Sequence, residues 1–182
     1  MAVRTPRHVA FLRAINVGGR IVPMEALRAV FVKMRFAEVE TFIASGNVIF
    51  APDFADRAAL ERRIERALHA SLGLDVPTFV RTSQEVRDLA KVAPFPPRLM
   101  REAGSVNVGF LAAPLDAKAR AALASLATPI DVIETRGSEV FWLCRKTQSQ
   151  STLSNVVIER AIGVRTTFRG IKTVVRLAGK LA

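Results

Sequence analysis

The segment from Arg13 to Arg20 contains the residues whose types and spacing are best suited to bind an anion. It reads Arg-Ala-Ile-Asn-Val-Gly-Gly-Arg and follows a run of bulky apolar residues. A strand that ends in paired glycines can turn backbone N–H groups toward a phosphate, while flanking arginines add positive charge. The candidate anion-binding residues are Arg13, Asn16, Gly18, Gly19 and Arg20. A tight turn that needs positive φ at both glycines explains the same pattern without a ligand.

A second polar turn, Ser45-Gly46-Asn47, supplies two further candidate residues. Together with Asn16, the side chains of Ser45 and Asn47 could line a cleft between domains that receives a small anionic metabolite. The protein would then be an enzyme, although no catalytic residue can be assigned from the sequence. Asparagine also commonly bonds the backbone of its own turn, and in that case these residues serve the fold alone.

Cations recur along the last predicted helix. Lys172, Arg176 and Lys180 follow one another at intervals of four residues, so they share one face, and Arg169 lies just before them. Such a row could follow the phosphates of a nucleic acid. Arg169, Lys172 and Arg176 are therefore candidate anion-binding residues, although a charged outer helix face is commonly only solvated.

The chain carries 27 Lys and Arg against 16 Asp and Glu, a net charge of +11. Both ends are basic: no acid precedes Glu25, and none follows Glu159. If the two ends meet in the fold, they form one basic region that attracts nucleic acid or another phosphate-bearing ligand. An arginine-rich composition alone would also produce this excess.

The elements that must position these residues follow the order β-α-β-β-α-β twice. In the first half, strands are predicted at 8–15, 39–43, 48–50 and 76–80, with helices after Pro23 and from Asp53 or Asp56 to Gly73. In the second half, strands are predicted at 105–112, 130–133, 139–144 and 166–168, with helices from Asp116 and from about Ser149 to Gly163. Thr82 and Glu85 have the spacing of a capping box for a short helix between the halves.

This order predicts an α+β protein of two ferredoxin-like βαββαβ units in tandem, packed together, with an extra C-terminal helix. The predicted boundaries are 1–82 for the first unit, 83–104 for a short helix and a Pro-rich linker, 105–169 for the second unit and 170–182 for the basic helix. Val9, Phe11 and Ile15 should lie on one face of the first strand, and Ala10 and Leu12 on the other. Because both faces are apolar, we expect neither to be fully wet.

Several classes of protein are excluded by composition. No apolar run approaches the roughly 18 residues that span a bilayer, and no signal peptide is recognisable. One cysteine and two histidines leave no metal site and no disulfide within the chain. We therefore expect a cytoplasmic protein without metal or cofactor, whose oligomeric state stays open and is compatible with a monomer. Cys144, Phe141 and Trp142 are expected to pack inside the protein.

Four runs of residues resemble the bacterial domain-of-unknown-function family 1697. They are Phe11-Leu12-Arg13-Ala14-Ile15-Asn16-Val17-Gly18-Gly19, Thr41-Phe42-Ile43-Ala44-Ser45-Gly46-Asn47-Val48, Pro94-Phe95-Pro96 and Thr173-Val174-Val175-Arg176-Leu177. The resemblance implies tandem ferredoxin-like domains and supplies no reaction. The chain departs from the family at three places: Ala14 replaces a glycine, Gln150-Ser151-Thr152-Leu153 replaces Arg-Ser-Lys-Leu, and Gly170-Ile171 replaces Asn-Trp.

These observations favour a binding module for an anionic, phosphate-bearing partner such as nucleic acid. The alternative is an enzyme that acts on a small anionic metabolite in a cleft between the domains. A concave pocket that contains the side chains of Arg13, Asn16, Ser45 and Asn47 would favour the enzyme.

Overall fold

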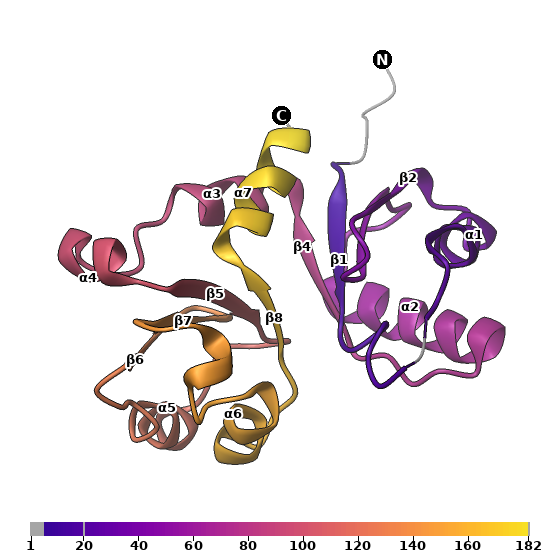
Figure 1. The fold of residues 1–182 in the computed structure, drawn as a ribbon. Helices are drawn as coiled ribbons and strands as arrows, with labels where there is room; N and C mark the ends of the chain where they lie inside the picture. The colour runs from indigo at the N-terminus through magenta and orange to yellow at the C-terminus, as the bar shows by residue number, and fades with distance from the viewer. Residues whose placement is uncertain (1–5, 20, 182) are drawn as a thin grey trace. The chain divides into compact units, whose positions relative to one another are not determined.

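The computed structural model describes residues 6–19 and 21–181, and it contains two four-stranded antiparallel sheets with helices (Figure 1). The first half comprises β1 (His8–Leu12), α1 (Met24–Lys33), β2 (Ala37–Phe42), β3 (Asn47–Ala51), α2 (Arg57–Leu72), β4 (Thr78–Thr82) and α3 (Ser83–Lys91). The helix α4 (Pro97–Glu102) follows. The second half comprises β5 (Ser105–Phe110), α5 (Ala117–Ala124), β6 (Asp131–Arg136), β7 (Glu139–Cys144), the short 3-10 helix η1 (Gln148–Gln150), α6 (Asn155–Ile162), β8 (Thr167–Gly170) and α7 (Ile171–Lys180). The predicted tandem α+β architecture is confirmed.

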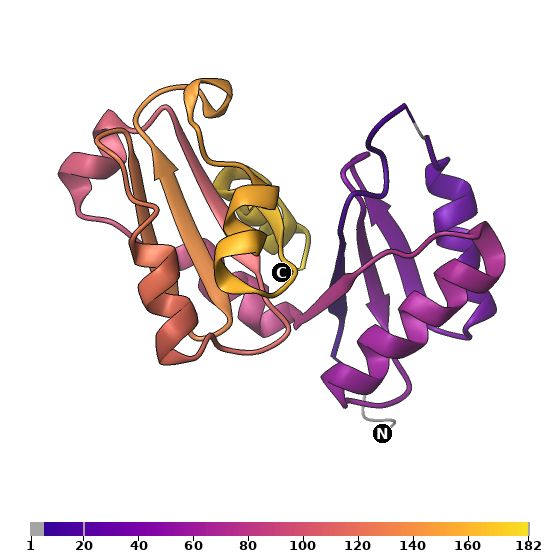
Figure 2. The same ribbon diagram turned by 90° about the horizontal axis from the view of Figure 1, so that it is seen from below.

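The chain divides into two compact units, whose described residues are 6–19, 21–88 and 177–181 in the first unit and 89–176 in the second. The strand order is β2-β3-β1-β4 in the first unit and β6-β7-β5-β8 in the second. In each unit two helices cover one face of the sheet, α1 and α2 in the first and α5 and α6 in the second (Figure 2). Within the described ranges, no helix combines the length and the apolar character that a bilayer crossing requires.

The helix α2 begins and ends where its sequence indicates. The Asp56 carboxylate accepts a hydrogen bond from the Ala59 N–H at 2.6 Å, so Asp56 is the N-cap. Gly73 has a φ of 66° and closes the C-terminus in the left-handed conformation. Between them, Leu60, Ile64 and Leu68 are fully buried at four-residue intervals. This apolar ridge packs α2 against the sheet.

Both faces of each sheet are buried, as expected. On the face away from the helices, Val9, Phe11 and Ile49 are 0% exposed in the first sheet, and Val108, Phe110 and Phe141 are 0% exposed in the second. The placement of Ile15 with Val9 and Phe11 was wrong. Ile15 belongs to the helix-side core with Ala10 and Leu12. The strand ends at Leu12 and Ala14 has a positive φ of 53°, so the alternation of faces stops there.

The helix predicted from about Ser149 begins instead at Asn155. The Ser154 hydroxyl accepts a hydrogen bond from the Val157 N–H at 3.3 Å and is the N-cap. The preceding segment is held by Ser151, whose hydroxyl donates to the Asp131 carboxylate and accepts from the Leu153 N–H. A side chain that bonds both to a neighbouring strand and to its own backbone competes with helix formation. The segment therefore stays irregular.

The Pro-rich segment predicted as a linker is attached to the second sheet. Pro94 and Phe95 are buried, and the Arg136 guanidinium donates to the carbonyl groups of Ala93 and Pro94 at 3.4 and 3.2 Å. The last proline of the run, Pro97, begins α4, since proline is well tolerated at the first position of a helix. The helix α4 was not predicted.

Candidate phosphate-binding surfaces

The polar side chains near the glycine loop come together at one end of the first sheet, where they hold two loops in place. The Asn16 side chain accepts from the Val22 N–H at 2.7 Å and donates to the Ala44 carbonyl at 2.9 Å. The fully buried Asn47 amide donates to the Phe42 carbonyl at 3.1 Å and to the Ser45 hydroxyl at 2.8 Å. These bonds stabilise the turns, which is the structural role that asparagine often has in loops.

The paired glycines adopt the backbone conformation that the turn interpretation requires. Gly18 and Gly19 have φ values of 70° and 80°, and no atom lies within 4 Å of where a Cβ would stand on either residue. Positive φ, and not a lack of space, therefore explains why glycine occurs here. Arg13 is half-buried, and its N–H donates to the Pro77 carbonyl at 2.9 Å. Arg20, the other predicted cation of this loop, lies outside the described residues.

The two basic ends of the chain meet in the first unit, but carboxylates face them. Arg7 Nη2 lies 3.4 Å from the Lys180 carbonyl oxygen. Arg7 forms an ion pair with Glu38 at 3.9 Å, and Lys180 forms one with Glu40. The predicted pooling of charge is thus offset by β2, whose acids were not considered in the sequence interpretation. Arg4 lies outside the described residues.

The cations predicted to form a row on α7 differ in their contacts. Lys172 and Arg176 are exposed, and Lys180 forms an ion pair with Glu40. The buried side of the helix consists of Val174, Leu177 and Leu181. Val175 is 49% exposed. Two exposed cations on α7 therefore remain as candidate phosphate contacts.

Arg169 is only 8% exposed and does not join that row. Its guanidinium donates to the Thr167 hydroxyl at 2.8 Å and to the Phe168 carbonyl at 2.9 Å. Burial lowers the pKa of Arg169 to about 10, so the side chain is still protonated at neutral pH. A guanidinium enclosed in this way supports the sheet and offers little surface to a polyanion.

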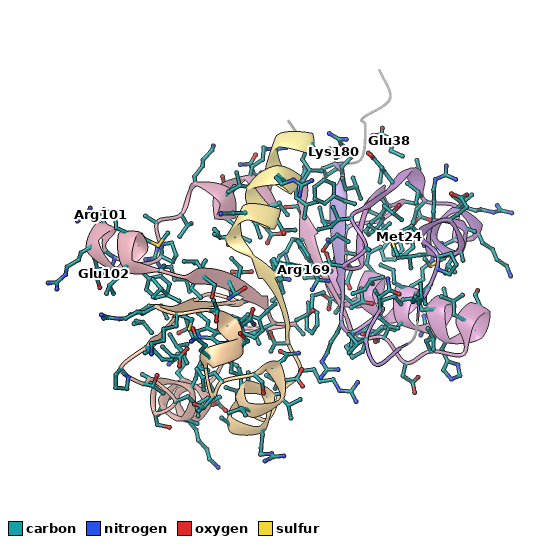
Figure 3. The ribbon with its side chains drawn as sticks, viewed as in Figure 1. Met24, Glu38, Arg101, Glu102, Arg169 and Lys180 are labelled. Carbon is teal, nitrogen blue, oxygen red and sulfur yellow. The ribbon has the colours of Figure 1, made fainter. Side chains whose placement is uncertain are left out.

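A second basic surface, not identified from the sequence, lies on α4 and the end of β7. The carboxylate of Glu102 is shared by two arginines, with Arg98 Nε at 2.9 Å and Arg145 Nη1 at 3.2 Å. Arg101 lies on the same short helix (Figure 3). The hydrogen bond from Arg98 is the main cause that holds the pKa of Glu102 below its ordinary value, and the charges of Arg145 and Arg101 act in the same direction.

Main-chain contacts bring Lys146 to the same surface. The Gly104 N–H donates to the Cys144 carbonyl at 2.9 Å, and a Cβ on Gly104 would stand 2.3 Å from the Lys146 carbonyl oxygen. Only glycine allows the end of α4 to approach the β7 strand so closely. We name this set the α4 basic cluster: Arg98, Arg101 and Arg145 around Glu102, together with Lys146, which follows Arg145 in the chain.

No signal in the sequence could have found this cluster. Arg145 lies 43 residues from Glu102 along the chain, and Arg98 to Glu102 lie next to a proline run that indicated a linker. Their proximity depends on α4 and on the Gly104 contact. Both features are tertiary.

Two other ionisable groups in the described residues, Cys144 and Asp131, are buried and serve the packing or hydrogen bonding of the fold. Cys144 is fully buried, which raises the pKa of its thiol. The Asp131 carboxylate accepts from the Trp142 indole N–H at 2.8 Å and from the hydroxyl groups of Thr128 and Ser151. Among the described residues, no group of three or more His, Cys, Asp and Glu side chains is arranged to hold a metal ion.

The fold and these surfaces define a protein of two tandem α+β units with a basic exterior. A family model described as "Protein of unknown function (DUF1697)" matches residues 6–141, and the chain belongs to this family. Among solved structures, a conserved bacterial protein, SP0830 from Streptococcus pneumoniae, is similar with a TM-score of 0.74 and 22% sequence identity. The match covers 97% of this chain and 99% of that one, and it shows a shared fold. No curated protein matches the chain.

Proposed function

We propose that this protein binds the phosphate backbone of nucleic acid through the α4 basic cluster. The observation that carries the proposal is the ratio of charges within the cluster: three arginines act on the single carboxylate of Glu102, and Lys146 adds a fourth cation next to Arg145 in the chain. Two of the arginines share that carboxylate, so the cluster keeps an excess of positive charge at the surface. Guanidinium groups match phosphate geometry and can bond it through two N–H groups at once.

Exposure and neighbouring groups support the same partner. The Arg98 side chain is 82% exposed although it bonds Glu102. Next to Lys146, the exposed run from Thr147 to Gln150 offers hydroxyl and amide groups, which are common phosphate contacts in nucleic-acid complexes. The net charge of +11 would draw a polyanion toward the whole molecule.

We expect binding to depend little on base sequence. Phe141 and Trp142 are both 0% exposed, so neither can stack on a base as the sheet aromatics of RNA-recognition modules do. Contacts would go mainly to phosphates, which carry no sequence information. We place this activity in the bacterial cytoplasm, where polynucleotides are abundant and a single thiol such as that of Cys144 stays reduced.

Fluorescence anisotropy with a short labelled DNA duplex tests the proposal. Four phosphate contacts predict a salt slope of roughly −3.6, so affinity should fall roughly 100-fold between ~50 and ~200 mM salt. A flat salt response, or the absence of binding at ~50 mM salt, would overturn the proposed function.

Matched double variants locate the site. Arg101→Gln with Lys146→Gln removes two cations from the cluster, while Arg62→Gln with Arg66→Gln removes two exposed cations from α2. The first pair should reduce the slope by about 1.8, and the second should leave it nearly unchanged. Glu102→Gln should tighten binding, because it removes the only carboxylate of the cluster. Equal losses in the two double variants would assign binding to net charge alone.

A further inference from the structure

In the described residues, three of the four edge strands carry covered main-chain groups or a bulge at or next to their outer edges. In β4, the outward N–H groups of Thr78, Val80 and Thr82 donate to the carboxylates of Glu65, Glu61 and Glu85 at 2.8–2.9 Å. Just before β8, the N–H of Thr166 donates to Glu159, and its carbonyl accepts from the Asn155 amide. These side chains occupy the groups that a further strand would need.

The edge of β2 is blocked in a different way. Its pairing with β3 is interrupted between Ala37 and Glu40, and Glu38 has a positive φ of 50°. The Arg28 guanidinium also donates to the Val39 carbonyl at 3.2 Å. A bulged strand with a covered carbonyl makes a poor template for another strand.

The fourth edge strand, β6, is regular, and Thr128 bonds the outward main-chain groups of its first residue, Asp131. It pairs with β7 over six consecutive residues without a register shift. The Arg145 N–H donates to the Ile130 carbonyl at 2.8 Å, so the alternation of antiparallel pairing turns Val132 and Glu134 toward β7 and Ile133 and Thr135 outward. Across residues 6–19 and 21–181, no side chain or loop bonds the outward main-chain groups of Ile133 or Thr135.

We propose that β6 pairs antiparallel with β6 of a second copy of this chain. The open edge is self-complementary: Ile133 and Thr135 each present one donor and one acceptor, spaced two residues apart. A two-fold axis at Glu134 places Ile133 of one copy opposite Thr135 of the other, and the reverse. The four open N–H groups and four open C=O groups of the two copies then form four hydrogen bonds. Such isologous pairing is the usual symmetry of dimers.

The charge of Glu134 and the net charge of the chain predict how strongly the two copies associate and how association depends on salt. Glu134 is exposed and stands opposite its own copy in this register, which weakens the pairing. Each copy also carries a net charge of +11, so the copies repel one another and salt should strengthen their association. A two-strand contact buries less area than a standard interface, and we expect a Kd on the order of 100 µM.

Sedimentation velocity over a concentration series tests this dimer without nucleic acid. Thr135→Pro removes an outward N–H while keeping the groups that bond β7, and it should weaken association about tenfold or more. Thr135→Ala keeps the N–H group and should associate like the natural protein. Glu134→Gln should tighten association a few-fold. Monomers at all concentrations, or a dimer insensitive to Thr135→Pro, would overturn the proposal.

Hydrogen exchange of the unaltered protein gives a second test that does not depend on any variant. The amides of Ile133 and Thr135 should become protected as concentration rises, while amides that already bond β7 should not change. Fast exchange at these two amides in a demonstrated dimer would place the interface elsewhere. Because association should increase with salt while nucleic-acid binding decreases, the failure of one proposal is distinguishable from the failure of the other.

Discussion

The strands β2 and β6 hold the same position in their respective sheets, yet their outer edges differ. In the first unit, a bulge at Glu38 and the Arg28 side chain interrupt the edge. In the second unit, β6 stays regular and leaves Ile133 and Thr135 uncovered. The loops differ in the same sense, since Asn16 and Asn47 bond turn backbone in the first unit, whereas the α4 basic cluster of the second faces solvent. One topology therefore supports a unit whose edge and loops are bonded internally and a unit that leaves a strand edge and a basic cluster open.

Two equivalent positions of the two sheets, Arg81 and Arg169, have the same surroundings, and both are buried. Arg81 pairs with Val9 on the central strand of its sheet, as Arg169 pairs with Val108. Each guanidinium donates to the carbonyl of the residue just before it, at 2.8 Å for Arg81 and 2.9 Å for Arg169. The arginines are 1% and 8% exposed. This shared geometry assigns both to support of the sheet.

The largest expected effect comes from removing these arginines. Arg81→Ala and Arg169→Ala should each lower the free energy of unfolding by about 3 kcal/mol, because buried hydrogen bonds from a charged group and the packing of a long stem are lost. Urea denaturation measures the change, with the exposed Arg62→Ala as control. A large loss at one arginine and none at the other would show that the two positions are not equivalent.

The glutamates along β4 give a smaller effect that depends on pH. Glu61→Ala should cost about 1–3 kcal/mol, since the buried N–H of Val80 loses its acceptor. Burial raises the pKa of Glu61, and the Val80 N–H only partly opposes this. The folded protein therefore binds a proton at Glu61 more readily than the unfolded chain, so this carboxyl destabilises the fold above its raised pKa.

Glu61→Gln keeps an acceptor for the Val80 N–H and removes the charge. It should raise the free energy of unfolding at neutral pH, and the gain should vanish as pH falls below the ordinary pKa of a glutamate, about 4.3. Thermal denaturation at several pH values measures this trend. A gain that is independent of pH would contradict the role of the buried charge.

The smallest effect concerns two alanines, Ala14 and Ala113, each of which stands two positions after a buried leucine at or just after the end of β1 or β5. Ala14 follows Leu12 with a φ of 53°, whereas Ala113 follows Leu111 and precedes Pro114, which favours extended backbone. Ala14→Gly should stabilise the protein by up to about 1 kcal/mol, and Ala113→Gly should destabilise it by about 0.4–1 kcal/mol. Melting temperatures that shift in the same direction would contradict the assigned backbone strain.

Local patterns predicted most of the elements. Asp56 and Asp116 are N-caps as expected, and the capping box of Thr82 and Glu85 is present. The resemblance to the family had already indicated that glycine is usual at position 14, and the positive φ of Ala14 supplies the physical reason. Such features depend on residues that are close in sequence.

Features that depend on distant residues could not be predicted. Glu61 and Glu65 lie in a helix rich in charged residues, where their local sequence does not distinguish them from surface charges, yet they bond the edge of β4. Arg169 was grouped with exposed cations because its neighbours in sequence are basic, and its strand buries it. The α4 basic cluster needed the contact between Gly104 and Lys146. Charge along a sequence does not indicate which carboxylates will face it.

Cys144 is the one cysteine of the chain, and its side chain is fully buried on β7. A thiol-specific reagent can therefore react with the native protein only when the second unit opens. The labelling rate would report that opening directly, without an added probe. Titration with nucleic acid, or concentration of the protein, should slow the reaction if either partner holds the second unit closed.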